Sequence, residues 1–271
     1  MSISIGKLAI AVTFFYNEDK FSFLQKIFSQ YKHLAKSVDA HIITNSCKED
    51  QHCIIRSLLN EADIPITIHC PTLLGHPYLL CWSHLSVFRT LFAEDNSITH
   101  FLYVEDDILI RKRNIIYWLE GREMLREYGL IPSFLRYEKK DDDFAKYSTD
   151  ITFSTLYSKL LHTKAKKDYV FINFHQPYQG LYLLDRELMA EHLNGPSSNP
   201  DSGIWSIREK AAQGLTYANV PEGFYSRNLV GFDTLKFSVD PECLVHHLPN
   251  NYANNPGTPF GKIPYQDLVL R

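Results

Sequence analysis

The chain has 271 residues, of which 45% are hydrophobic and 22% are charged, and its formal net charge is −3. This ordinary globular composition allows one large domain or two small ones. The slight negative charge gives no electrostatic reason to expect nucleic acid as a partner. No apolar run approaches the roughly 18 residues of a membrane span, so we expect at most peripheral association with a membrane.

The cysteines form an odd, scattered set without a CxxC motif. Such a set favours reduced, buried thiols and a cytoplasmic protein, at most peripheral at the inner face of the membrane. The apolar stretch 8–12 lacks the basic start and the cleavage site of a signal peptide. The five positions are Cys47, Cys53, Cys70, Cys81 and Cys243.

The first half of the chain alternates strand-like and helix-like patterns. Short apolar runs predict strands, and apolar residues at helical spacing predict the helices between them. This order predicts a mostly parallel central sheet with helices on both faces. The predicted strands cover residues 8–15, 40–44, 64–69 and 101–104, and the predicted helices begin near Asn17, Ser46 and Cys81.

Three consecutive acids, Glu105, Asp106 and Asp107, follow the fourth predicted strand. Burying an unpaired carboxylate costs several kcal/mol, so a cluster at the end of a core strand needs a positive partner. A divalent metal with oxygen ligands is one such partner. The alternative is a solvated turn that starts where the strand ends. Because ligands bind at the carboxyl ends of strands in open sheets, the triplet and the segment 13–17 after the first strand favour the metal interpretation.

The second half is less regular. A helix is expected over 114–128 and a hairpin or mobile excursion within 138–168. The charge run 138–143 reads as a solvated face. The tail from Pro249 reads as a loop and a possible flap. We therefore predict one domain over 1–271, with a regular first part (1–112) and a less regular second part (113–271) that ends in the possible flap.

Two further elements bear polar groups near the predicted site. His246 and His247 lie on a short predicted strand, and one of them is a candidate for metal or diphosphate binding, since imidazole suits Mn²⁺. The alternative places one histidine in the core and the other outside. Asp201 precedes a predicted helix over 204–213, where it is a candidate N-cap.

The motif Val104-Glu105-Asp106-Asp107 resembles the DXD metal motif of glycosyltransferases with the GT-A fold. The first strand with residues 13–17 resembles the nucleotide-contacting start of that fold, and residues 199–208 resemble its acceptor-side acid motif. Pro200 stands where many relatives carry Glu, which leaves Asp201 as the acid of that motif.

The resemblance implies a GT-A-like fold and a metal-dependent transfer of a sugar from a nucleotide sugar, foremost a UDP-sugar, to a glycan or polysaccharide. It also implies that 1–112 is the nucleotide-sugar-binding half and 113–271 the acceptor-side half. The cofactor is Mn²⁺ or Mg²⁺, and Asp201 is the base if the reaction inverts. The implied metal ligands are Asp107, Glu105, His247 and His246. The implied donor-binding residues are Thr13, Phe14, Tyr16, Asn17, Glu105, Asp106 and Arg227, the last as a phosphate partner or, alternatively, as half of a surface ion pair.

Two other functions remain open at this stage. A nucleotidyltransferase or phosphohydrolase also uses clustered acids, although the segment after the first strand lacks the glycine-rich loop of the former. A non-catalytic sugar-binding protein derived from such an enzyme is the third possibility. The donor sugar, the acceptor, the linkage and the oligomeric state have no signature in the sequence.

Overall fold

The computed structural model describes residues 3–72, 74–141, 143–175 and 178–271. The chain divides into two compact units. Unit 1 comprises Met1–Lys112 and Gly180–Leu215, and unit 2 comprises Arg113–Gln179 and Thr216–Arg271. The chain therefore leaves unit 1 once and returns to it for 36 residues, since Gly180–Leu215 belongs to the first unit.

Unit 1 is built on a five-stranded sheet with the order β12-β4-β1-β2-β3. Neighbours among β1 to β4 pair in parallel, whereas β12 pairs antiparallel with β4. The apolar runs form strands buried on both faces, as parallel strands require. The predicted α/β fold with a mostly parallel central sheet is confirmed. The strands are β1 (Ile5–Phe14), β2 (Ala35–Thr44), β3 (Ile66–His69), β4 (His100–Glu105) and β12 (Leu181–Asp185).

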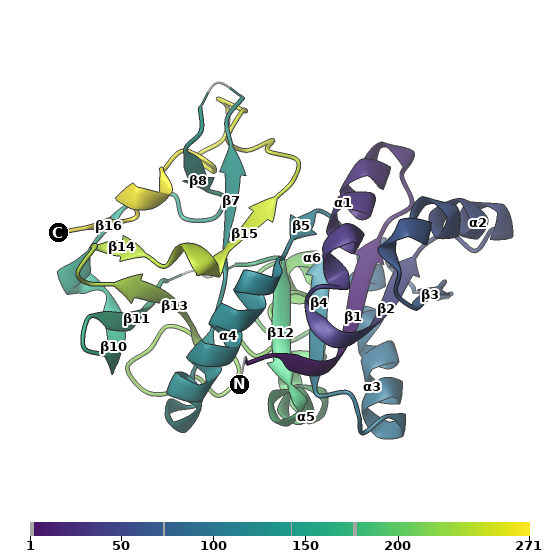
Figure 1. The fold of residues 1–271 in the computed structure, drawn as a ribbon, viewed down its shortest axis with the longest axis horizontal. Helices are drawn as coiled ribbons and strands as arrows, with labels where there is room; N and C mark the ends of the chain where they lie inside the picture. The colour runs from purple at the N-terminus through teal and green to yellow at the C-terminus, as the bar shows by residue number, and fades with distance from the viewer. Residues whose placement is uncertain (1–2, 73, 142, 176–177) are drawn as a thin grey trace. The chain divides into compact units, whose positions relative to one another are not determined.

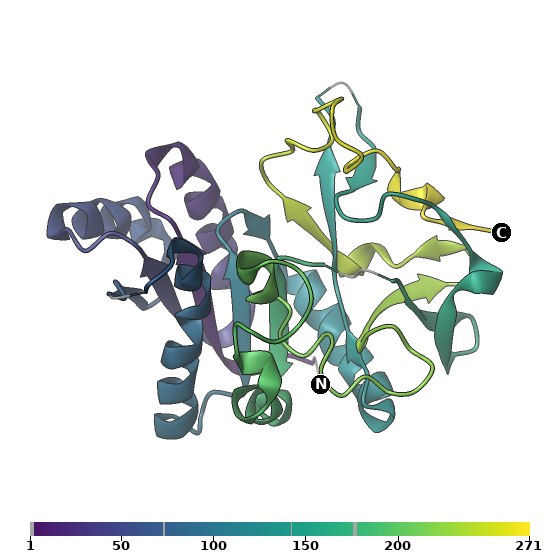
Figure 2. The same ribbon diagram turned by 180° about the vertical axis from the view of Figure 1, so that it is seen from behind.

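Helices cover both faces of this sheet. The helices α1 and α2 lie on the face turned to the viewer in Figure 1, and α3 and α5 lie on the face seen in Figure 2. The predicted apolar stripe of α1 is buried through Leu24, Ile27, Phe28 and Tyr31. The helices of unit 1 are α1 (Phe21–Tyr31), α2 (Glu49–Leu58), α3 (His84–Glu94), α5 (Arg186–Asn194) and α6 (Ile207–Lys210), with 3-10 turns η1 (Glu18–Lys20), η2 (Asn60–Ala62), η3 (Pro77–Trp82) and η6 (Pro196–Ser198).

The order of the strands creates a topological switch point between β1 and β4. From β1 the chain proceeds through α1 to β2 and through α2 to β3 on one side, and it then crosses to β4 on the other side of β1. The connections after β1 and before β4 therefore diverge. Ligands of open α/β sheets bind outside the carboxyl ends of the strands at such a point.

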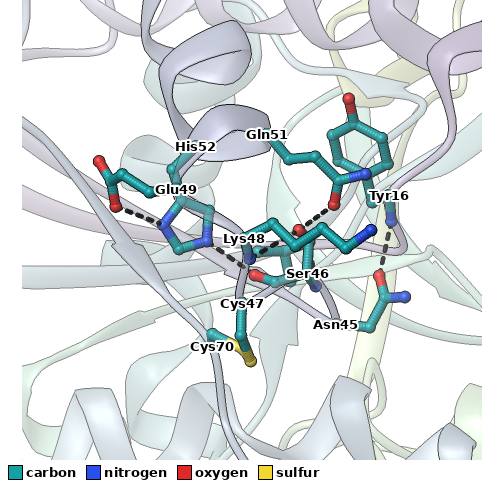
Figure 3. The surroundings of a disulfide bond; sticks show 10 residues. Tyr16, Asn45, Ser46, Cys47, Lys48, Glu49, Gln51, His52 and Cys70 are labelled. Atoms are coloured by element: carbon teal, nitrogen blue, oxygen red, sulfur yellow. Dashed lines mark hydrogen bonds and ion pairs between the residues drawn. A yellow bond between two sulfur atoms is a disulfide. The ribbon is translucent and has the colours of Figure 1, made fainter.

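A disulfide between Cys47 and Cys70 joins the segment after β2 to the segment after β3 (Figure 3). The prediction that the cysteines are reduced is therefore wrong for these two residues, and the redox argument for a cytoplasmic protein no longer holds. Cys53, Cys81 and Cys243 are free thiols. Two cysteines 23 residues apart in sequence carry no spacing motif, and only the pairing of β2 with β3 brings them together.

Unit 2 contains the helix α4 and several short sheets. The predicted helix over 114–128 is confirmed as α4 (Lys112–Leu125) followed by η4 (Arg126–Tyr128). One sheet has the order β10-β11-β13-β14, with β6 beside β13, and in another β7 pairs with β8 and β15. The strands are β6 (Ile131–Pro132), β7 (Leu135–Lys139), β8 (Lys146–Ser148), β10 (Leu161–Lys166), β11 (Tyr169–Asn173), β13 (Asn228–Asp233), β14 (Ser238–Val239) and β15 (Leu244–His247).

The region predicted as a hairpin or mobile excursion forms two hairpins, β7–β8 and β10–β11. The remaining short elements are β5 (Ile108–Leu109), β9 (Thr155–Leu156), which pairs with β16 (Val269–Leu270), and the turns η5 (Tyr157–Lys159), η7 (Pro241–Cys243) and η8 (Tyr265–Asp267). Within the described ranges, no helix has both the length and the apolar character needed to cross a membrane.

Candidate functional site

The acidic triplet lies at the switch point of the unit 1 sheet. Glu105 is the last residue of β4, and Asp106 and Asp107 form the turn that follows. In the parallel pairing of β1 with β4, Glu105 is the register partner of Thr13, near the end of β1. The sequence therefore placed the triplet and the 13–17 segment at the correct edge, and the register brings the two strand ends side by side.

Asp106 is held by a lysine that the sequence analysis did not select. The ammonium of Lys20 lies 2.9 Å from one carboxylate oxygen of Asp106 and 3.1 Å from the other. Only 8% of the Asp106 side chain is exposed, compared with 36% for Lys20. Both oxygens of this predicted donor-binding residue are thus engaged by a side chain of the same unit.

The charges in this pair shift both pKa values. Burial, together with repulsion from Asp107, raises the pKa of Asp106 to about 7, although Lys20 opposes both effects. Burial disfavours the charged form of Lys20, but the attraction of Asp106, with Asp107 and Glu105 behind it, outweighs burial and raises the pKa of the ammonium. The lysine therefore stays charged and is the cation that permits the buried carboxylate.

The donor chemistry of the triplet fits a hard divalent cation in part. Among the described residues, no group of three or more His, Cys, Asp or Glu side chains is arranged to hold a metal ion. Mg²⁺ bound with a nucleotide, however, usually takes only one or two protein carboxylates, and phosphates and water complete its shell. Glu105 and Asp107, both half-buried beside the engaged Asp106, suit that smaller requirement.

The segment after β1 divides into buried and exposed residues. Thr13 is buried, and Phe14 is fully buried against the rings of Tyr16 and Phe21, with centroids 6.1 and 6.2 Å away. The Tyr16 backbone N–H donates to Asn45 Oδ1 at 2.7 Å, which ties this segment to the one after β2 (Figure 3).

Two neighbouring residues complete that segment. The Asn17 side chain accepts from the Asp19 N–H at 3.0 Å and caps η1, as its residue type predicts. Phe15, which the sequence analysis passed over, is 57% exposed. It directly follows β1, and a large apolar side chain left exposed at a ligand-binding edge is the signal that selects it.

Asp201 lies in unit 1, on an exposed stretch before α6. Its N–H donates to Asn199 Oδ1 at 3.0 Å. The helix predicted from Ile204 starts only at Ile207, with Ser206 at the N-cap position, so the alternative role of Asp201 as the helix cap is wrong. Its role as a base stays a prediction.

The segment that contains Asp201 is anchored to η3. The indole N–H of Trp82 donates to the Ile207 carbonyl at 2.7 Å. Burial raises the pKa of the adjacent Cys81 thiol to about 12, Glu105 raises it too, and Arg208 of α6 lowers it. Glu105, at the end of β4, and Arg208, in α6, therefore both lie close enough to Cys81 to influence its thiol. The start of α6 thus lies near the edge of the sheet where β4 ends.

His246 and His247 belong to unit 2 and are both buried, with 8% and 6% exposed. The alternative that placed one of them outside is wrong. His247 Nδ1 lies 2.5 Å from Glu138 Oε1, and its ring stacks on Tyr252 at 5.4 Å. His246 stacks on Tyr137 at 4.8 Å and its Nε2 lies 2.9 Å from Asn250 Oδ1.

Glu138 corrects the prediction of a solvated charge run over 138–143. Its side chain is fully buried. One oxygen meets His247, and the other accepts from the Ala253 N–H at 2.6 Å. A carboxylate on one ring nitrogen orients a histidine and fixes its tautomer, as is usual for histidines that bind metals. This arrangement is compatible with the predicted metal role of His247, which stays a prediction.

Further hydrogen bonds hold the tail from Pro249, the segment predicted as a possible flap. The Lys139 N–H donates to Asn250 Oδ1 at 2.9 Å, and Lys262 donates to the carbonyls of Tyr252 and Asn255 at 2.9 and 2.7 Å. In this structure the segment is therefore bonded to β7 and to itself, and its movement as a flap stays a prediction.

Arg227 also lies in unit 2 and is 5% exposed. Its guanidinium donates to the carbonyls of Gly129 at 2.7 Å and Ala218 at 3.4 Å. Arg227 is therefore buried and does not lie at the surface, as the alternative of a surface ion pair requires. A contact of Arg227 with phosphate stays a prediction.

A scan against protein-family models and a search of curated proteins find no match. Among solved structures the chain is similar to the mannosyltransferase PcManGT from Pyrobaculum calidifontis, solved with GDP-Man and Mn²⁺, at 11% identity and a TM-score of 0.48 over 89% of this chain and 56% of that one. It is also similar to TarS from S. aureus, at 10% identity and a TM-score of 0.40 over 77% of this chain and 34% of that one. The chain thus spans about half and about a third of the lengths of these proteins, and similarity at this level does not place it in a family.

Proposed function

We propose that the protein is a glycosyltransferase that transfers a sugar from a nucleoside-diphosphate sugar, foremost a UDP-sugar, to a hydroxyl of a glycan acceptor. The observation that carries the proposal is the position of Glu105, Asp106 and Asp107 at the switch point, with Glu105 beside Thr13. Ligands of parallel sheets bind at this point. A bound diphosphate needs a cation to neutralise its charge, and the carboxylates would hold that cation.

The donor half of the site would work through carboxylates and backbone. Asp107 and Glu105 would hold Mn²⁺ or Mg²⁺ together with the donor diphosphate. When bound, the metal would neutralise the charge that develops on the leaving phosphate. The segment from Thr13 to Asn17, held by Asn45, would receive the nucleoside, with the exposed ring of Phe15 available for stacking on a base.

The acceptor half of the proposal rests on Asp201. Its exposed carboxylate would take the proton of the acceptor hydroxyl as that oxygen attacks the anomeric carbon, which is general-base catalysis with inversion. Anchoring of the following α6 to η3 through Trp82 and Ile207 supports this role, because it fixes the segment that presents Asp201.

The test is a titration of the protein with UDP- and GDP-sugars, with and without Mn²⁺, followed by thermal stability and by product analysis. We expect a metal-dependent rise in Tm and release of a nucleoside diphosphate. Release of pyrophosphate would instead identify a nucleotidyltransferase. Binding of sugar that ignores chelator would identify a non-catalytic binding protein, and no shift with any nucleotide would refute the proposal.

The substitution Asp107→Asn should weaken the metal-dependent binding of UDP by at least about 100-fold, because it removes the charge of a principal ligand. The fold should remain, since the amide keeps the shape of the side chain. Asp63→Asn is the matched control: Asp63 is exposed with a φ of 55°, a conformation that Asn also tolerates. Unchanged UDP binding by Asp107→Asn would overturn the metal assignment.

A further inference from the structure

We infer that Lys20 is a positioning residue of the donor site: its ammonium reserves the Asp106 carboxylate and leaves Glu105 and Asp107 as the pair that meets a divalent cation and a nucleoside diphosphate. This inference rests on the proposed function and deepens it. It assigns unequal tasks to the three acids, and it adds a residue from the segment after β1 to the site.

The geometry of the pair is specific. Lys20 Nζ lies within hydrogen-bond distance of both Asp106 oxygens, at 2.9 and 3.1 Å, across 86 residues of sequence. The lysine ends η1, which Asn17 caps, so the contact ties the segment after β1 to the turn after β4. The pair thus spans the two strand ends that form the switch point.

Helix capping does not explain a lysine at position 20. Lys20 lies where η1 passes into α1, its backbone is helical, and its side chain makes no cap hydrogen bond. Asn17 caps this helical run, and a cation in its first turn opposes the positive end of the helix dipole. The buried carboxylate of Asp106 does explain the lysine, because it needs a positive partner.

The charge of Lys20 has a direct consequence for metal binding. While the ammonium holds Asp106, it repels a second cation nearby and withholds one carboxylate from it. The nucleotide-free protein should therefore bind a bare divalent ion weakly, and binding should gain from the added phosphate charge of a nucleoside diphosphate. Without the lysine, Asp106 loses its ion-pair partner, and a bound cation can take its place beside that carboxyl group without competing with the ammonium.

The experiment measures Mn²⁺ binding to nucleotide-free protein through the electron paramagnetic resonance signal of free Mn²⁺. We expect Lys20→Gln to bind Mn²⁺ about tenfold more tightly than the wild type, a factor that corresponds to ~1.4 kcal/mol. Lys20→Arg keeps the charge and should retain the wild-type affinity. Lys26→Gln, an equal charge change at an exposed position on α1, is the matched control and should also retain it.

A double substitution separates the two effects of the lysine. In the Asp106→Asn background, Lys20→Gln should tighten Mn²⁺ binding less than it does alone, because no carboxylate remains to be released. A purely structural role for the pair predicts a lower Tm and no tighter binding. Equal or weaker Mn²⁺ binding by a folded Lys20→Gln protein overturns the inference; if that protein does not fold, a tenfold change in Lys20→Arg overturns it.

The proposed function and this inference fail in different ways. If wild-type protein binds UDP with Mn²⁺ but Lys20→Gln shows no gain in Mn²⁺ affinity, only the assignment of Lys20 is wrong. If wild-type protein binds neither Mn²⁺ nor any nucleoside diphosphate, the proposed function is wrong and the inference falls with it.

Discussion

Five histidines of unit 1 lie where burial favours their neutral form. Burial lowers the pKa of His41 and of His100 to about 4, and that of His84 and of His192 to about 3. Burial also lowers the pKa of His69. His41 Nδ1 and His69 Nε2 lie 3.0 Å apart on neighbouring strands, so one ring donates to the other, and protonating both rings would leave this hydrogen bond without an acceptor.

These shifts predict an acid-sensitive protein. A histidine whose pKa is lower in the folded than in the unfolded state makes the unfolded chain bind more protons between those two values, so stability falls as the pH falls through that window. For His41 the window runs from its ordinary value of 6.5 down to about 4. Its contribution amounts to up to about 3 kcal/mol across the window.

The free energy of unfolding in urea at pH 7 and pH 5 tests this prediction. The wild type should lose stability between the two, and His41→Gln should lose less because one titrating group is gone. The exposed His33, changed to Gln, provides the matched control. An equal loss in wild type and His41→Gln would show that the ring of His41 accepts a proton in the folded state.

At the scale of residues, the burial and the partners of Lys20 and Glu138 could not be predicted from the sequence. Each is a charged residue in a stretch that reads as solvated, and each has its partner far along the chain, 86 and 109 residues away. A local pattern identifies a charged residue but not the distant partner beside which it is buried. The triplet was predictable, in contrast, because three acids inside an apolar run are anomalous without any knowledge of partners.

At the scale of elements, the disulfide fixes the segments after β2 and β3. Cys47 lies two residues after Asn45, whose side chain holds the Tyr16 N–H (Figure 3). Ser46 and His52 add hydrogen bonds around the same turn, since Ser46 Oγ donates to Gln51 and His52 Nε2 lies 2.7 Å from the Ser46 carbonyl. The crosslink thus stiffens the support of the predicted nucleoside segment.

Removing the disulfide should therefore affect both stability and binding. The variant Cys47→Ser with Cys70→Ser should lose about 3 kcal/mol of unfolding free energy, the loop entropy expected for a separation of this length. Its affinity for UDP with Mn²⁺ should also fall, because Asn45 is held less firmly. Cys53→Ser, at an exposed free thiol, is the control, and equal stability of the three proteins would show that the crosslink adds nothing to folding.

Element boundaries were less predictable than element types. The spacing of Ser46 and Glu49 predicts a capping box, yet α2 starts at Glu49 with Lys48 as N-cap, and Ser46 bonds to Gln51 instead. The disulfide at Cys47 constrains the backbone just before the helix, and a side-chain motif does not override that constraint. Helical periodicity, by contrast, identified α1 and α4 because burial of one face depends only on spacing.

At the scale of the whole molecule, the return of Gly180–Leu215 to unit 1 was not predictable. The segment adds β12 antiparallel to β4 and brings Asp201 into the unit that holds the triplet. The sequence of β12 resembles any other apolar strand. No local feature indicates that its pairing partner, β4, lies about 80 residues earlier. The βα alternation of the first half predicts the parallel core, because each crossover there is short and local.

This division makes a prediction about unfolding as a whole. The triplet, the disulfide and the five histidines with lowered pKa values all belong to unit 1. Ligand, crosslink and pH should therefore act on the same calorimetric transition. UDP and Mn²⁺ at 100 times their dissociation constant should stabilise it by about 2.7 kcal/mol, close to the ~3 kcal/mol that the disulfide contributes.

Scanning calorimetry of the oxidised protein and of the Cys47→Ser, Cys70→Ser variant tests this coupling. In the variant, UDP with Mn²⁺ at 100 times the variant's own dissociation constant should return the affected transition to within a few degrees of the ligand-free wild type, since the two free energies nearly cancel. Lowering the pH from 7 to 5 should move that same transition downward. The opposing outcome is that the nucleotide raises the Tm of a transition whose Tm neither acid nor loss of the disulfide lowers. In that case the donor would bind outside unit 1, and the switch point of this sheet would not be its site.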